Sequence, residues 1–123
     1  MAGTQNLAAK QMREWTWSGT EKNAARRAFD LALRKELDSA INEAKERAAR
    51  ISEASELWEL EEWLGKRRRK IDSTFDYRCS VLPEVFASLI FNGLLTLEQL
   101  NGIAPEKVEY IRKIVDWANS RAE

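Results

Sequence analysis

Apolar residues recur every three or four positions through the first half of the chain. No glycine or proline occurs from Glu21 to Ile51. The repeating apolar positions are Leu33, Leu37, Ile41 (or Ala40), Ala44, Ala48 and Ile51. This spacing is typical of one face of an α-helix. The sequence Ser18-Gly-Thr-Glu21 has the pattern of a capping box, so we expect the helix to begin there.

A second long helix is predicted directly after the first. The sequence Ser52-Glu-Ala-Ser55 indicates a break and a new N-cap. Apolar residues then continue at Leu57, Trp58, Leu60, Trp63, Leu64, Ile71 and Phe75. Gly65 lies in the interior of this helix, where glycine costs about 1 kcal/mol relative to alanine. It indicates either close approach of a partner to the backbone or simple tolerance.

The two helices are expected to form an antiparallel hairpin that dimerises. The first helix is roughly 45 Å long at about 1.5 Å per residue, and one small domain does not cover that length. Small residues beyond Leu37 permit another helix to come close. We therefore predict a homodimer rather than a monomeric hairpin. Its interface, which we name the apolar seam, is predicted to contain Leu33, Leu37, Ile41, Ala44, Ala48, Leu60 and Leu64.

Shorter helices are predicted in the C-terminal part of the chain. Pro83 lies inside the apolar run from Val81 to Phe91, as a first-turn proline or as a kink. Asn92-Gly93 ends that helix, and Thr96-Leu-Glu-Gln99 opens one short turn that Asn101-Gly102 closes. Pro105 starts the last helix. Its inward residues are expected to be Val108, Ile111, Ile114, Val115 and Trp117.

The predicted organisation is a single all-α domain over residues 1–123. Residues 18–76 form a stalk of two long antiparallel helices, and residues 78–121 form a small C-terminal helical head. Residues 1–16 lack clear periodicity and are expected to be a flexible tail. Trp15 and Trp17 are predicted to anchor its end by packing, because a tryptophan buries a large area.

The amino-acid composition limits the classes of protein to which this chain can belong. The chain has 123 residues, of which 44% are hydrophobic and 33% are charged, which fits one globular domain. Lys+Arg and Asp+Glu both total 20, so no net field attracts nucleic acid or an anionic membrane. No apolar run approaches the roughly 20 residues of a membrane span, and no signal peptide is recognisable. We expect no membrane insertion and, with one cysteine, a cytoplasmic protein.

The sequence lacks the residue patterns that most often serve in catalysis. Histidine is absent, which removes the commonest general base and metal ligand. Cys79 has no histidine partner and is expected to be a buried thiol. The carboxylates of Glu59, Glu61 and Glu62 point to different sides of a helix and are expected to be solvated. We therefore predict no enzyme activity, no metal and no cofactor, and instead a protein that binds another protein.

One charged run stands out in the second helix. Lys66-Arg-Arg-Arg-Lys70 places five cations around the helix, and Glu62 and Lys66 form a favourable i, i+4 pair. The other cations either bind phosphate or partner carboxylates, or only keep the surface soluble. Trp58 and Glu62 lie one turn apart, and with Arg68 they have the composition of a binding hot spot. Trp58 is equally compatible with the core.

The second helix and its surroundings resemble a known family. The residues that carry the resemblance are Leu57-Trp-Glu-Leu-Glu-Glu-Trp-Leu-Gly-Lys-Arg-Arg-Arg-Lys-Ile-Asp72, Phe75-Asp-Tyr-Arg78, Ser80-Val-Leu82, Trp17-Ser18, Phe29-Asp30, Leu37, Val85-Phe-Ala87, Gly93-Leu-Leu-Thr-Leu-Glu98 and Lys107 to Arg112. In order and spacing, residues 17–115 are similar to the fluorescence recovery protein family of cyanobacteria.

The resemblance implies an all-helical dimer with a helical head at each end. It also implies a non-enzymatic regulator that binds the photoactivated orange carotenoid protein. Such a regulator accelerates the return to the resting form and so ends photoprotective quenching at the phycobilisome. Carried over by position, the protein-binding residues are Trp58, Glu61, Glu62 and Arg68. We name these four residues the docking ridge.

The chain also departs from the family pattern. Glu61 stands where the family has histidine, Glu62 replaces an aspartate and Trp63 a phenylalanine, and Pro83-Glu84 replaces aromatic or aliphatic residues. These changes disfavour the usual partner. The first alternative is therefore a divergent dimeric scaffold that binds a different protein in a bacterium without the carotenoid protein. The second alternative is a helical dimer that binds nucleic acid through Lys66–Lys70, although the balanced charge makes nucleic acid an unfavoured partner.

Overall fold

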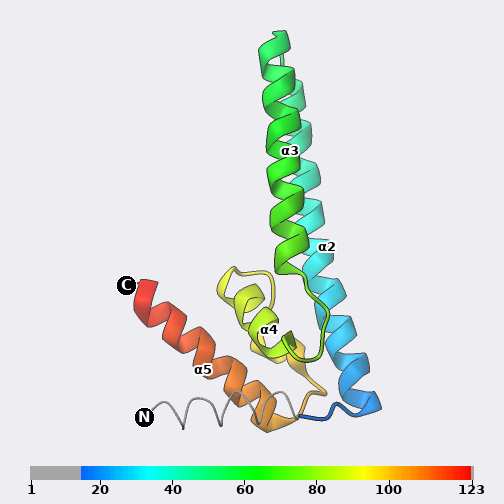
Figure 1. The fold of residues 1–123 in the computed structure, drawn as a ribbon, viewed down its shortest axis with the longest axis vertical. Coiled ribbons are helices and arrows are strands. Elements are labelled where there is room, and N and C mark those ends of the chain that lie inside the picture. The colour runs from blue at the N-terminus through cyan, green and yellow to red at the C-terminus, as the bar shows by residue number, and fades with distance from the viewer. Residues whose placement is uncertain (1–14, 123) are drawn as a thin grey trace.

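The computed structural model describes residues 15–122, so the predicted tail lies almost wholly outside the described residues. Within them the chain is all-helical, as predicted. The elements are α2 (Gly19–Ala49), α3 (Ala54–Thr74), α4 (Leu82–Phe91), the 3-10 helix η1 (Leu97–Leu100) and α5 (Pro105–Ala122). Figure 1 shows α2 and α3 side by side as a long antiparallel rod, with α4 and α5 gathered beside the N-terminal end of α2.

The ends of the long helices are set by local hydrogen bonds. At the start of α2, the Ser18 hydroxyl accepts from the Glu21 N–H at 3.1 Å, and the Glu21 carboxylate accepts from the Ser18 N–H at 3.1 Å. This is the predicted capping box. The predicted break before α3 is also present, but its cap is Glu53. There the carboxylate of Glu56 accepts from the N–H groups of Ser52 and Glu53.

The hydrophobic core lies in the head and includes the first third of α2. Its contributions from α2 are Ala24, Ala25, Ala28, Phe29 and Ala32, and its largest fully buried side chains include Phe86, Leu82, Leu89, Leu100 and Ile111. The small alanines let the head approach α2 closely. Gly102 extends this approach, because a Cβ placed there would lie 2.8 Å from the Cβ of Ala24. Beyond the head the stalk has little core, since no residue of α3 is buried.

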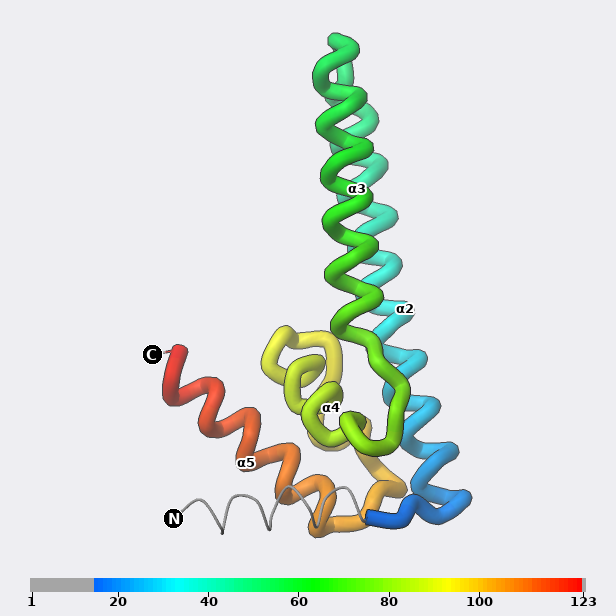
Figure 2. Tube along the Cα trace, in the orientation of Figure 1, coloured from blue at the N-terminus to red at the C-terminus, as the bar shows by residue number. Residues whose placement is uncertain are grey.

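Aromatic residues of the loop after α3 fix the head to the stalk. Figure 2 shows the chain running beside α2 before it enters α4. The ring of Phe29 meets those of Phe75 and Tyr77 edge-on, with centroids 5.4 and 4.9 Å apart. The Tyr77 hydroxyl donates to the carbonyl of Lys22 at 3.3 Å. Stalk and head are therefore joined by packed aromatic rings and one hydrogen bond.

The N-terminal tryptophans pack as predicted. Trp17 is buried in the core, and the half-buried Trp15 lies edge-on to Tyr110 with 5.8 Å between the ring centroids. Pro83 is the second residue of α4 and forms part of its first turn, so α4 is not kinked by it.

Two expectations about individual side chains are wrong. Trp117 does not face inward but is 61% exposed. Because each residue turns about 100° around a helix, Trp117 points roughly 200° away from the buried Val115, two positions earlier. Cys79 is exposed rather than buried. The inward positions of its loop belong to Phe75 and Tyr77, and the chain turns outward at residues 78–80.

Candidate docking surface on the stalk

A polar network joins the two stalk helices. From α3, the guanidinium of Arg67 reaches Glu36 at 2.8 Å and Glu43 at 3.3 Å on α2. Glu43 also pairs with Arg47 at 2.9 Å. The ring of Trp63 completes the network, with the guanidinium of Arg47 4.6 Å from its centroid. A guanidinium can serve two carboxylates and a ring at once because it is planar and carries five donors.

The polar network lowers the pKa of one carboxyl group, that of Glu43. A hydrogen bond from Arg47, aided by the charges of Arg47 and Arg67, holds the pKa of Glu43 below its ordinary value. Glu43 therefore stays ionised across the physiological range. In the sequence, Arg67 stands only as one member of a cationic run, so this role was not predicted. The available signal was that Trp63 precedes Arg67 by one turn, so Arg67 has no acid at i−4 on its own helix.

One side of the hairpin exposes the apolar seam. Leu37, Ile41 and Leu64 are exposed, as is Ala48, while Leu33, Ala44 and Leu60 are partly buried. Leu33 packs against the head core. Leu57 is also exposed and extends this stripe, because it precedes Leu60 and Leu64 by three and seven positions. Leu57 was predicted in the helix but not in the seam.

The α2 and α3 parts of the seam lie on the same side of the hairpin. Leu37 directly follows Glu36, which contacts α3, and Leu64 directly follows Trp63, which contacts α2. One residue is a rotation of about 100° in the same sense along each helix. Since the helices run antiparallel, this rotation brings both leucines to the same side. The stalk thus presents a continuous apolar stripe two helices wide.

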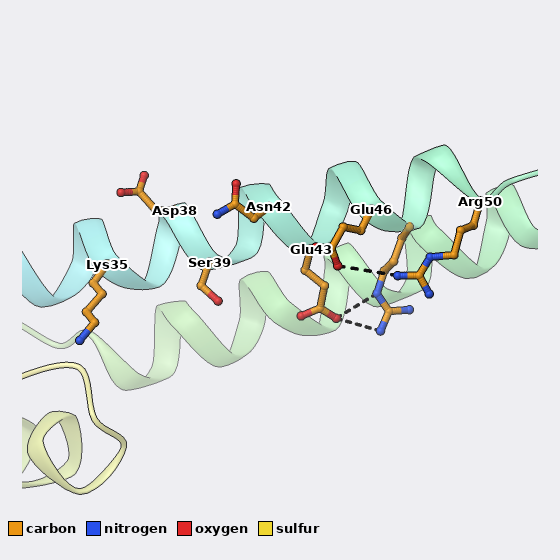
Figure 3. Close-up of a pocket in the computed structure, with 8 residues that line it drawn as sticks. Lys35, Asp38, Ser39, Asn42, Glu43, Glu46 and Arg50 are labelled. Atoms are coloured by element: carbon orange, nitrogen blue, oxygen red, sulfur yellow. Dashed lines mark hydrogen bonds and ion pairs between the residues drawn. The ribbon is translucent and has the colours of Figure 1, made fainter.

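A polar groove runs along α2, and Figure 3 shows its lining. It has a volume of about 670 Å³ and is lined by Lys35, Asp38, Ser39, Asn42, Glu43, Glu46, Arg47 and Arg50. The acids pair with nearby arginines, as Glu46 does with Arg50 at 3.7 Å. All of these side chains are polar, so we interpret this groove as a solvated surface. Within residues 15–122, no cluster of histidine, cysteine or acidic side chains is able to hold a metal.

The docking ridge lies on the exposed surface of α3. Trp58 is 61% exposed, which decides between core and surface for the single chain. Glu61 and Glu62 are exposed one turn further on, and Glu62 forms the predicted pair with Lys66 at 3.2 Å. Arg68 lies 3.9 Å from Asp72 and is almost fully exposed. The structure therefore brings Trp58, Glu61 and Glu62 together, with Arg68 two turns beyond them.

Gly65 lies on the same surface as the docking ridge. Within the chain, a Cβ there would meet only the end of the flexible Arg69 side chain, at 3.4 Å. No other part of the described chain packs closely against this glycine.

None of the helices described in the structure is long and apolar enough to cross a membrane.

Comparison with known proteins decides the family. A model of the family described as photoprotection regulator fluorescence recovery protein matches residues 17–115. The chain belongs to the fluorescence recovery protein family. The resemblance noted in the sequence is thereby confirmed, and the chain is a member of a family of photoprotection regulators.

This chain spans nearly the whole length of two relatives in the fluorescence recovery protein family. The fluorescence recovery protein of Synechocystis is 34% identical over 104 residues, which are 85% of this chain and 95% of that protein. The solved structure of the Fremyella diplosiphon protein has a TM-score of 0.78 at 36% identity, covering 82% of this chain and 99% of that one. The solved Synechocystis structure has a TM-score of 0.77 at 33% identity, with the same coverage.

Proposed function

We propose that this chain is a homodimeric, non-enzymatic regulator that binds the photoactivated orange carotenoid protein and accelerates its return to the resting form. Membership of a family of photoprotection regulators supports this proposal. So does the stalk, which exposes the apolar seam and the docking ridge at the same time. The observation that carries most weight is the exposure of Trp58 beside Glu61 and Glu62 on a helix without a buried residue.

The dimer part of the proposal follows from the apolar seam. Fully burying a leucine or isoleucine side chain is worth roughly 1.5–3 kcal/mol. Leu37, Ile41, Leu57 and Leu64 are all substantially exposed in one chain. A second copy offers the same stripe, so a two-fold axis lets the seams cover each other. The polar groove on α2 would remain in water.

The mechanism needs differential binding and no covalent step. A protein changes a conformational equilibrium or its rate only if it binds one state, or the transition state, better than the other. A rigid stalk suits this task because its side chains are held at fixed spacing. Trp58 would supply buried area on docking, and Glu61, Glu62 and Arg68 would supply charge complementarity. The exposed single thiol of Cys79 fits a reducing compartment, so we place this activity in the cytoplasm.

The dark recovery of the photoactivated carotenoid protein tests the proposal. Addition of this chain should accelerate the colour change, and Trp58→Ala should remove most of the acceleration. Trp117→Ala is a matched control, because Trp117 is equally exposed at 61% but lies on α5 in the head. An unchanged recovery rate with the wild-type chain would refute the proposal.

A divergent scaffold with a different protein partner is the second candidate function. The observation that favours it is the extra acid on the docking ridge, where both Glu61 and Glu62 are exposed, together with the exposed Glu84 on α4. These charges alter the complementarity that a partner must have. A source genome that encodes no orange carotenoid protein would favour this candidate over the first.

A further inference from the structure

The tryptophan rings of this chain are covered by cations, with one exception. The ammonium of Lys107 lies 4.4 Å from the ring centroid of Trp17 and 6.0 Å from that of Trp15. Arginines cover the other two rings, Arg47 that of Trp63 at 4.6 Å and Arg121 that of Trp117 at 5.0 Å. Among residues 15–122, Trp58 is the one tryptophan without a cation over its ring.

Trp63 shows how this chain holds a guanidinium. Arg47 stacks on the ring of Trp63, and the same guanidinium pairs with the carboxylate of Glu43 at 2.9 Å. The ring attracts the cation through its quadrupole, while the carboxylate accepts charge-assisted hydrogen bonds from the edge of the guanidinium. Within this molecule, a tryptophan face on α3 and a carboxylate on α2 thus hold one guanidinium together.

Trp58 also has carboxylates beside it but no arginine, and here the carboxylates are on the same helix as the ring rather than on α2. Glu61 and Glu62 follow it by three and four positions and so lie beside its ring. Glu62 is engaged with Lys66 at 3.2 Å, whereas Glu61 makes no ion pair with any residue in the described part of the chain. The preceding turn of the helix offers only Ala54 and Ser55. The helix itself therefore provides no positive charge to this ring.

We propose that Trp58 and Glu61 form a receptor for an arginine side chain presented by the protein partner. This inference rests on the proposed docking function of the ridge and specifies the chemistry of its partner. Charge complementarity supports a cation, because an exposed ring and an unpaired carboxylate face the solvent together. The internal examples favour arginine at an exposed ring, since Trp117 and Trp63 carry arginine, whereas Lys107, the lysine that covers Trp15 and Trp17, is itself buried.

A short peptide tests the receptor without the carotenoid protein. The probe is acetyl-tetra-arginine amide, with tetra-lysine amide as the comparison, titrated at low salt against the full chain. Trp58→Leu and Glu61→Gln should each weaken tetra-arginine binding about three- to fivefold, the range for an exposed cation–π contact. Glu59→Gln is the matched control, because it removes another exposed acid from a different side of α3.

The control decides how the peptide result is interpreted. Equal weakening by Glu61→Gln and Glu59→Gln would overturn the receptor, because it reduces binding to non-specific charge. Tighter binding of tetra-lysine than of tetra-arginine would overturn the choice of arginine. All substitutions are on the surface, and unchanged helical circular dichroism verifies that each variant is folded.

A charge exchange tests the receptor in the complex. Glu61→Arg should weaken binding to the photoactivated carotenoid protein about tenfold, and one arginine-to-glutamate substitution on that protein should restore it. If wild type binds the carotenoid protein and Glu61→Arg binds it equally well, the receptor is wrong and the proposed function stands. If wild type does not bind it at all, the proposed function fails, and the peptide titration still decides the receptor. If Glu61→Arg weakens self-association alone, the arginine belongs to a second copy and our assignment of the occupant is overturned.

Discussion

The ammonium of Lys107 on α5 lies 2.7 Å from the carboxylate of Glu21 on α2, and both side chains are nearly shielded from solvent. The same ammonium donates to the carbonyl of Thr16 at 2.6 Å. One buried cation therefore joins the N-terminal segment, the start of the stalk and the last helix of the head. Removal of one partner from such a site leaves the other charge buried without compensation.

The pH dependence of stability should report this pair. Burial raises the pKa of Glu21, but hydrogen bonds from Lys107 and from the N–H groups of Ala104 and Ser18 outweigh it and lower the pKa to about 2. Because the folded-state pKa is below the ordinary value of 4.5, this stabilisation is complete above about pH 5 and is lost as the pH falls towards 2. The loss is about 3 kcal/mol at about 1.4 kcal/mol per pKa unit.

Urea unfolding at a series of pH values measures this loss. The Glu21→Gln variant is the control, because it has no carboxylate to protonate at this position. Its stability should fall less than that of the wild type between pH 5 and pH 2. Parallel curves for the two proteins would show that other carboxylates account for the acid sensitivity.

Substitution of Lys107 alone should lower the free energy of unfolding, and much of that loss should come from its interaction with Glu21. Lys107→Met should lower the free energy of unfolding by about 3 kcal/mol, because the Glu21 carboxylate stays buried without its counter-ion. The double variant Glu21→Gln/Lys107→Met should lose less than the two single losses together. Urea unfolding of all four proteins gives the coupling energy, and strictly additive losses would contradict a direct interaction.

Arg67 should stabilise the packing of α3 on α2, whereas the neighbouring Arg68 should not. Arg67→Lys keeps the charge but loses the fork that serves Glu36 and Glu43, so α3 should pack less firmly on α2. We expect amide hydrogen exchange in α3 to accelerate about fivefold, which corresponds to about 1 kcal/mol for the lost hydrogen bonds. Arg68→Lys, at an exposed position, should leave the exchange rates unchanged. Equal rates in both variants would show that the network contributes nothing to the hairpin.

The apolar seam should control the oligomeric state. Leu37→Glu/Leu64→Glu places charges in the stripe and should convert the dimer to a monomer in sedimentation equilibrium. Leu31→Glu is the control, since Leu31 is similarly exposed at 49% but lies on a different side of α2. Dissociation by Leu31→Glu alone would indicate a different interface. A wild-type chain that sediments as a monomer would refute the dimer altogether.

The helices were predictable because their signals are local. Ser18 with Glu21, and Thr96 with Gln99, form caps through residues three positions apart, and both caps are present. The apolar repeat along α2 likewise depends only on spacing. Such features follow from backbone geometry and do not require knowledge of where other parts of the chain lie.

Features that depend on contacts between distant segments were not predictable in this way. The partners of Arg67 lie 31 and 24 positions earlier, and their pairing depends on the register of the hairpin. Cys79 was wrongly expected inside because hydrophobicity does not say which loop residues face the core. For Trp58, the apolar periodicity was compatible with a buried or an exposed side chain. Trp58 is exposed because Arg67 and Trp63 face α2 and so fix the rotation of α3 about its own axis.

The 21 residues of α3 include no buried side chain, so this helix has more freedom to change than the closely packed head. Substitutions on the side of α3 that faces away from α2 leave the packed alanines and aromatics of the head untouched, so they carry little folding penalty. New recognition chemistry can therefore accumulate one residue at a time on this helix while the same scaffold continues to fold. Position 61, where the exposed Glu61 lies, is one at which such a surface tolerates change.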